Sequence, residues 1–203
     1  NQLNPLDIQS CQSLATTYDA SSGQYVLYCN GEQVAAMTLP DSGSGGGPDV
    51  TVPVYIGEVP WESDFSGCVE RVLIYREALT QGQVQQATLL TDAPTQQPTT
   101  GAPTTAEPTT ATPTGPPLGP AAFDEARDPS GTCLTTATPP STVAGTVLTG
   151  ESHSTVMKID WTGATYSGSR EWLLNLGNQG TGAEHWLWSG GNNVQFGMWS
   201  GGN

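Results

Sequence analysis

Two tryptophans near the C-terminus have the type and spacing best suited to ligand binding. Trp186 and Trp188 lie two positions apart in residues 183–189, which we predict to form a strand, so both side chains face the same side of a sheet. An exposed pair of indoles is a stacking platform for sugar rings, whereas a buried pair fills the core of a sandwich. The sequence leaves both interpretations open, and carbohydrate binding through this pair is one hypothesis for a site.

The four cysteines, Cys11, Cys29, Cys68 and Cys133, are too widely spaced for a zinc knuckle or a redox-active CxxC pair. With only two histidines in the chain, we expect no structural metal site, no Ser-His-Asp triad and no cofactor. An even number of cysteines in an acidic, lysine-poor chain favours two disulfide bonds in an oxidising compartment. Four cysteines allow three pairings, and spacing alone does not choose among them.

The charge balance excludes several classes of partner. The 203 residues carry 19 acidic and five basic side chains, for a net charge of −14. Such a chain repels the phosphates of nucleic acids and the anionic lipids of a membrane surface. No apolar run approaches the roughly 18 residues of a membrane span, so we expect no membrane insertion.

Residues 91–120 form a linker that divides the chain. They hold half of the chain's 16 prolines together with ten threonines, and no apolar side chain larger than alanine precedes Leu118. Such a segment cannot offset its ordering entropy by burial, and its prolines favour an extended polyproline II conformation. Threonine beside proline is the composition of O-glycosylated stalks, the alternative being an unmodified flexible linker. The candidate O-glycosylation sites are Thr95, Thr99, Thr100, Thr104, Thr105, Thr109, Thr110, Thr112 and Thr114.

The elements that must position these residues are mostly strands. Before the linker we predict strands at 13–18, 24–29, 32–37, 51–56 and 67–75, and one short helix at 79–90 with Thr80 as its N-cap. After the linker we predict strands at 142–148, 156–161, 171–176, 183–189 and 194–199, with a charged loop at 124–128. Asn30-Gly31 is a strong hairpin signal between two of these strands.

Part of the sequence resembles a known protein family. Val54-Tyr55-Ile56-Gly57 followed by Phe65-Ser66-Gly67-Cys68 and Val72-Leu73-Ile74-Tyr75 is similar to the C-terminal signature of laminin-G-like domains, in the concanavalin A-like lectin/glucanase superfamily. Tyr18-Asp19 and Leu27-Tyr28-Cys29-Asn30-Gly31 resemble a hairpin of the same family. The resemblance covers residues 12–90, and residues 121–203 resemble the N-terminal half of the family more loosely. It implies an all-β jelly-roll β-sandwich with an extended linker.

The two halves stand in reversed order relative to the family. We therefore expect residues 1–90 to be the C-terminal half of one sandwich and 121–203 the N-terminal half of the next. This order favours a structural repeat unit of an extracellular glycoprotein filament, in which identical units join head to tail and each completes the half-sandwich of its neighbour. A separate subunit and one period of a longer tandem array both fit. The alternative is a lectin-like adhesion module that binds glycans.

The resemblance also bears on individual residues. The early hairpin brings Cys11 near Cys29, and the resemblance places Cys68 beside the strands that contain Cys133, so we expect these two disulfides. Glucanases of the superfamily use an E-x-D-x-x-E strand, but here Glu62 and Asp64 are followed by Gly67 in the third position, so we expect no enzymatic activity. Laminin-G-like domains bind calcium through loop residues, yet Asp41, Asp49, Asp64 and Asn192 fall on no family motif, and we predict no metal site.

Overall fold

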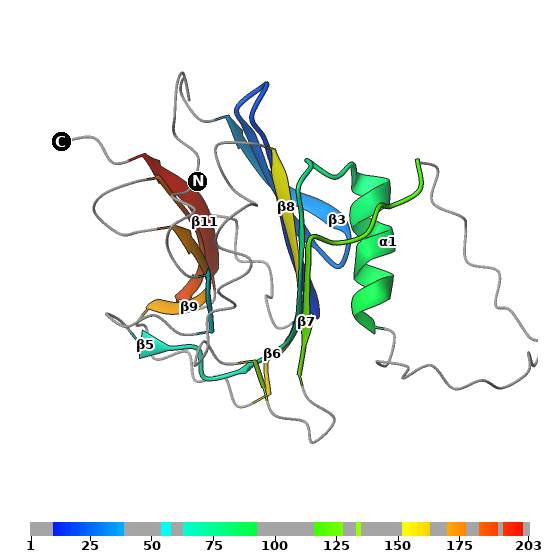
Figure 1. Cartoon of the computed structure of the whole chain (residues 1–203). Coiled ribbons are helices and arrows are strands. Elements are labelled where there is room, and N and C mark those ends of the chain that lie inside the picture. The colour runs from blue at the N-terminus through cyan, green and yellow to red at the C-terminus, as the bar shows by residue number, and fades with distance from the viewer. Residues whose placement is uncertain are drawn as a thin grey trace, which may run out of the picture.

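The computed structural model describes residues 10–38, 54–57, 63–92, 116–127, 133–134, 152–162, 170–177, 183–190 and 193–200. They form two facing sheets with one helix against the outside of one sheet (Figure 1). The six-stranded sheet, in the order β3-β2-β1-β8-β6-β7, comprises β1 (Ser13–Asp19), β2 (Gln24–Cys29), β3 (Glu32–Thr38), β6 (Cys68–Tyr75), β7 (Phe123–Ala126) and β8 (His153–Asp160). The second sheet has the order β11-β10-β9-β4, with β5 pairing β9; its strands are β4 (Val54–Ile56), β5 (Ser63–Asp64), β9 (Arg170–Gly177), β10 (Ala183–Gly190) and β11 (Asn193–Ser200). The predicted all-β sandwich is confirmed.

Alternation along β6 divides its side chains between the core and the outer face of the six-stranded sheet. Val69, Val72 and Ile74 belong to the core between the sheets, whereas Leu73 and Tyr75 belong to a second apolar cluster under the helix. A register shift just after Val69 brings Val72 into phase with it. From the opposite sheet, the core takes Ile56, Leu173, Leu174, Leu187 and Phe196. Both faces of the six-stranded sheet are therefore apolar near its centre, and both are covered.

The hairpin between β2 and β3 turns at Asn30 and Gly31, as predicted. Both residues have positive φ angles, 49° and 80°, as a two-residue type I′ turn requires. The Asn30 side chain accepts a 3.0 Å hydrogen bond from the Ser13 backbone N–H and donates one of 2.8 Å to the Ser10 carbonyl. This asparagine therefore fixes the start of β1 as well as the turn.

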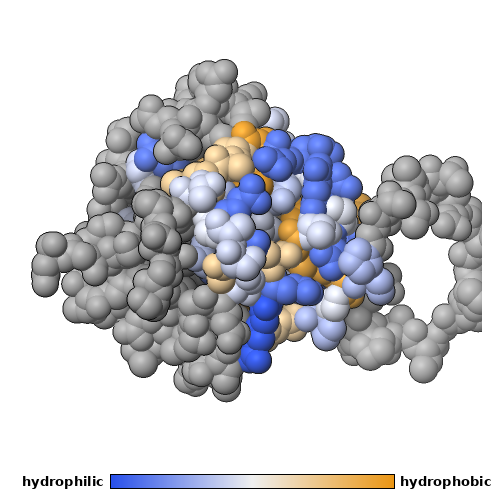
Figure 2. All heavy atoms as spheres, turned by 90° about the horizontal axis from the view of Figure 1, so that it is seen from above, coloured by the Kyte–Doolittle hydropathy of each residue, from blue (hydrophilic) through white to orange (hydrophobic). Residues whose placement is uncertain are grey.

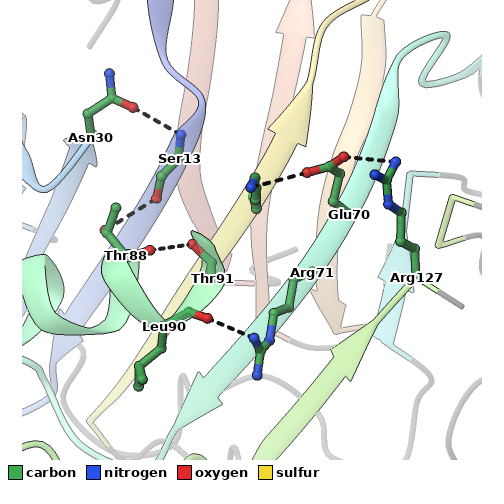
Figure 3. A network of polar contacts seen from close by, with 9 residues as sticks. Ser13, Asn30, Glu70, Arg71, Thr88, Leu90, Thr91 and Arg127 are labelled. Carbon is green, nitrogen blue, oxygen red and sulfur yellow. Dashed lines mark hydrogen bonds and ion pairs between the residues drawn. The ribbon is translucent and has the colours of Figure 1, made fainter. Parts of the chain in front are cut away.

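Helix α1 (Gln81–Asp92) covers the outer face of the six-stranded sheet. Thr80 caps it as predicted: its N–H donates to Gln83 Oε1 at 3.0 Å and its Oγ1 accepts from the Gln83 N–H at 3.4 Å. Val84 and Ala87, three residues apart, are fully buried against the sheet. At the other end of the helix, the Leu90 carbonyl accepts a 2.7 Å hydrogen bond from Arg71 on β6 (Figure 3).

Strands from both sides of the linker pair within one chain. The strand β8, from the C-terminal segment, lies between β1 and β6 and pairs with both in antiparallel register. We expected a neighbouring unit to complete each half-sandwich; in the described residues, strands from the two segments of one chain pair with each other. The segment 91–120 thus leaves and re-enters a single sandwich.

Several local expectations need correction. The predicted charged loop at 124–128 is in part strand β7, since Arg71, Val72, Leu73 and Ile74 on β6 pair with residues 123–126. The helix extends to Asp92, two residues into the predicted linker, and Leu118 packs near the helix cluster. The predicted strand at 142–148 and linker residues 93–115 lie outside the described residues, as do residues 51–53 of another predicted strand.

Viewed from above, the described surface is largely hydrophilic, with hydrophobic residues in small patches between the polar ones (Figure 2). Within the described residues, the large hydrophobic side chains that stay exposed are Leu89 and Leu90 at the end of α1. No helix in this part of the chain has the length and apolar character needed to cross a membrane.

Candidate functional site

The outer face of the five-stranded sheet contains a row of residues around Trp188. Trp188 on β10 lies directly opposite Trp172 on β9 and Gln195 on β11. Residues in direct register share one face of a sheet. Trp188 and Gln195 are partly exposed, whereas Trp172 is only 4% exposed. In this row a partly exposed indole lies between an amide on one neighbouring strand and a buried indole on the other.

A second row lies on the same face, two residues earlier along β10. Here Trp186 is in register with Asn175 on β9 and Gly197 on β11, and Asn175 is in register with Tyr55 on β4. Tyr55 is partly exposed and Asn175 is fully buried. The Trp186 side chain lies outside the described residues, so only its backbone position is placed. We call these two rows the aromatic face.

The aromatic face and the helix lie on opposite sides of the sandwich (Figure 1). The chain that returns from the linker lies on the helix side, since the Leu118 N–H donates a 3.3 Å hydrogen bond to Gln86 Oε1 of α1. Both ends of the Thr/Pro-rich segment are therefore on the side away from the aromatic face. The candidate O-glycosylation sites Thr95, Thr99, Thr100, Thr104, Thr105, Thr109, Thr110, Thr112 and Thr114 all lie outside the described residues.

The cysteines form two disulfides, and these are the two pairs that we expected. Cys11 bonds to Cys29 with a Cα–Cα distance of 5.3 Å, and Cys68 bonds to Cys133 with a distance of 5.2 Å. The first joins the residues just before β1 to the last residue of β2. The second joins the N-terminal segment to the C-terminal one across the linker. Two disulfides fit an oxidising compartment.

One described carboxylate, that of Glu171, contacts Ser66 beside the incomplete glucanase motif. Glu62 lies outside the described residues, and Asp64 belongs to β5, where it pairs with Trp172 on β9. Glu171, which no sequence motif singles out, is buried and accepts hydrogen bonds from the Ser66 hydroxyl at 3.1 Å and from the Ser66 N–H at 3.3 Å. These bonds tie the loop before β6 to β9 and give Glu171 a structural role.

The structure does not place the side chains of the residues considered for calcium. Asp41, Asp49 and Asn192 lie outside the described residues, as does the side chain of Asp64. Nowhere in the described part of the chain do three or more His, Cys, Asp or Glu side chains gather as a potential metal-binding group.

Comparison with known proteins agrees with this geometry. Residues 1–85 match a laminin-G family model of the concanavalin A-like lectin/glucanases superfamily. No curated protein and no solved structure matches the chain. The fold is thus an all-β sandwich of the concanavalin A-like kind, and the matched segment contains β1 to β6. This class of fold suggests an extracellular adhesion or lectin-like module.

The sequence identified Trp188 but missed its partners. Tyr55 lies in the family signature but was not singled out for binding, Gln195 and Asn175 carry no motif, and all three join Trp188 only through the register of four strands. The alternation of Val194-Gln195-Phe196 does signal that Gln195 and Phe196 face opposite sides of β11.

Proposed function

We propose that this chain is a lectin-like adhesion module of a secreted or cell-surface protein, and that it binds glycans on its aromatic face without transforming them. One observation carries the proposal: Trp188 is partly exposed and lies in direct register between Trp172 and Gln195. The class of fold and the two disulfides support an extracellular setting.

The chemistry of the aromatic face suits a neutral sugar. The C–H groups on one side of a pyranose ring pack on an indole, and a side-chain amide both donates to and accepts from hydroxyl groups. The strands on either side of β10 hold the Trp188 backbone in place, so little conformational entropy is lost on binding. A net charge of −14 disfavours sulfated and other strongly anionic glycans.

A glycan array probed with the whole chain tests this proposal. Trp188→Ala and Gln195→Ala should each weaken binding, the first by roughly tenfold or more, since an aromatic anchor dominates such contacts. Gln33→Ala is the matched control for Gln195→Ala, because Gln33 is an exposed glutamine on β3 of the other sheet. The proposal is wrong if the wild-type chain binds no glycan, or if Trp188→Ala binds as well as the wild type.

The second candidate is the structural unit of a filament, with identical chains joined head to tail and the segment 91–120 O-glycosylated. Its support is the open sheet edge at β11, an eight-residue strand that pairs only with β10 among the described strands. Such an edge can accept a strand of another copy. Because each chain completes its own sandwich, this association would join closed domains rather than exchange halves.

Mass measurement separates this candidate from the first. Light scattering of the purified chain should show a concentration-dependent series of oligomers if units join through β11. Deglycosylation followed by reducing, denaturing electrophoresis would show whether 21.2 kDa is the whole native chain. A chain that stays monomeric at every concentration contradicts the filament.

A further inference from the structure

A polar hollow opens where β1, β6 and β8 meet, on the other sheet from the aromatic face. It has a volume of about 490 Å³ and is lined by Gln12, Glu70, Lys158, Ile159, Asp160, Trp161 and Thr162. A volume of this size is in the range of small-molecule sites and accommodates roughly one or two sugar rings. Nothing in the sequence predicted it, because its walls come from three separate stretches of chain.

The indole in this hollow is held rigidly. The Trp161 Nε1–H donates a 2.7 Å hydrogen bond to the Cys11 carbonyl, and the ring meets Phe65 edge to face at 5.3 Å between centroids. Beside it, the Ile159 N–H donates to the Gln12 carbonyl at 2.9 Å, which fixes the backbone of the opposite wall. Because these contacts exist before any ligand arrives, a ring that stacks here binds to a surface that is already ordered.

The charged groups of the hollow largely compensate one another. Glu70 lies between two cations, at 2.8 Å from Arg127 Nη1 and 3.5 Å from Lys158 Nζ (Figure 3). Asp160 accepts a 2.9 Å hydrogen bond from the Thr162 N–H, and hydrogen bonds from Thr162 hold the pKa of its carboxyl below 3.8. Asp160 is therefore ionised at neutral pH and is a strong acceptor for hydroxyl groups.

We propose that this hollow is a second, independent binding site for a neutral sugar. Its indole provides the stacking surface, Asp160 and Gln12 provide acceptors, and Gln12 and Lys158 provide donors. The compensated charges disfavour an ionic ligand of either sign, whereas a polyhydroxylated neutral ring uses donors and acceptors together. The site does not depend on the aromatic face, which belongs to the other sheet.

The test is saturation-transfer and ¹H–¹⁵N NMR on the whole chain with methyl α-D-glucoside, methyl α-D-mannoside, methyl β-D-galactoside and the methyl β-glycoside of N-acetylglucosamine, each at millimolar concentration. At least one of them should shift the indole Nε1–H resonance of Trp161, assigned by its loss in Trp161→Phe. Asp160→Asn should weaken that binding roughly tenfold, since it removes a charged acceptor while keeping a side chain of the same shape.

Asp19→Asn is the matched control. Asp19 likewise ends a strand, is exposed to a similar degree and accepts a 2.9 Å hydrogen bond from a backbone N–H two residues on, that of Ser21, but it lies outside the hollow. Binding in Asp19→Asn and in Trp188→Ala should equal that of the wild type. The inference is overturned if no glycoside binds, if Asp160→Asn binds as Asp19→Asn does, or if Trp188→Ala abolishes the shift at Trp161.

Discussion

Arg71 connects three elements, and its removal gives a stringent test of the fold described above. The side chain is 16% exposed and donates to both oxygens of Asp124 on β7, from Nε at 2.9 Å and Nη2 at 2.7 Å. Its Nη1 donates to the Leu90 carbonyl in the last turn of α1. It therefore joins β6, β7 and the C-terminal end of the helix.

The cost of Arg71→Ala follows from these contacts. The pair with half-exposed Asp124 contributes about 0.5–1 kcal/mol. The charge-assisted bond to Leu90, together with the favourable interaction of a cation with a helix C-terminus, adds about 1.5–2 kcal/mol. We expect Arg71→Ala to lower the free energy of unfolding by about 2–3 kcal/mol. Arg71→Lys keeps the charge but loses the two-pronged geometry, and we expect it to cost about half as much.

Arg127→Ala is the control, because Arg127 is 42% exposed and its partner Glu70 also contacts Lys158. Its loss should cost only about 0.5 kcal/mol. Urea unfolding followed by tryptophan fluorescence measures both values, and hydrogen exchange should show faster exchange in the last turn of α1 for Arg71→Ala alone. Equal destabilisation by the two alanine variants, or unchanged exchange in α1, would refute the reasoning.

Three further substitutions test separate features of the fold. In Gly31→Ala the new Cβ would lie 2.8 Å from Gln85 Cγ, at a residue whose φ is 80°. We therefore expect thermal unfolding to show that the free energy of unfolding falls by about 1 kcal/mol or more. An unchanged melting temperature would contradict the turn geometry. Thr80→Ala removes the helix cap and should cost about 1 kcal/mol in urea unfolding, whereas Thr80→Ser should not. The double variant Cys68→Ala/Cys133→Ala opens a loop with a sequence separation of 65 and so raises the chain entropy of the unfolded state. We expect it to lower the free energy of unfolding by about 4 kcal/mol, and a decrease below about 1 kcal/mol would contradict this entropic explanation.

Local sequence signals predicted those parts of the fold that local physics determines. Asn30-Gly31 predicted a hairpin because the two positive φ angles of its turn are costly for other residues. Alternation along residues 67–75 separated the core side of β6 from its outer side. In contrast, β7 was taken for a loop, because a four-residue strand with three polar or small side chains gains its stability from pairing with β6.

The site was predictable only where single residues carry a signal. Trp188 stands out by type and spacing, but its neighbour Gln195 is set by the register between β10 and β11. The hollow beside Trp161 was not predictable at all, since Gln12, Glu70 and Asp160 are brought together by pairing between strands far apart in sequence. The pairing of Cys68 with Cys133 came from the family resemblance and not from spacing.

The Cys68–Cys133 bond determines how the chain responds to mechanical tension. Every residue of the segment 91–120 lies inside the loop that this bond closes, so a force applied through the two ends of the chain bypasses the segment. The Thr/Pro-rich stretch then bears no load, and it cannot act as a tether between successive domains. Once this one bond is reduced, unfolding of the domain under force would add the 65-residue separation to the stretched chain, roughly 220 Å of contour length. A module in an adhesive protein would thereby hold a reserve of extensible chain that pulling releases only after a reductant has acted.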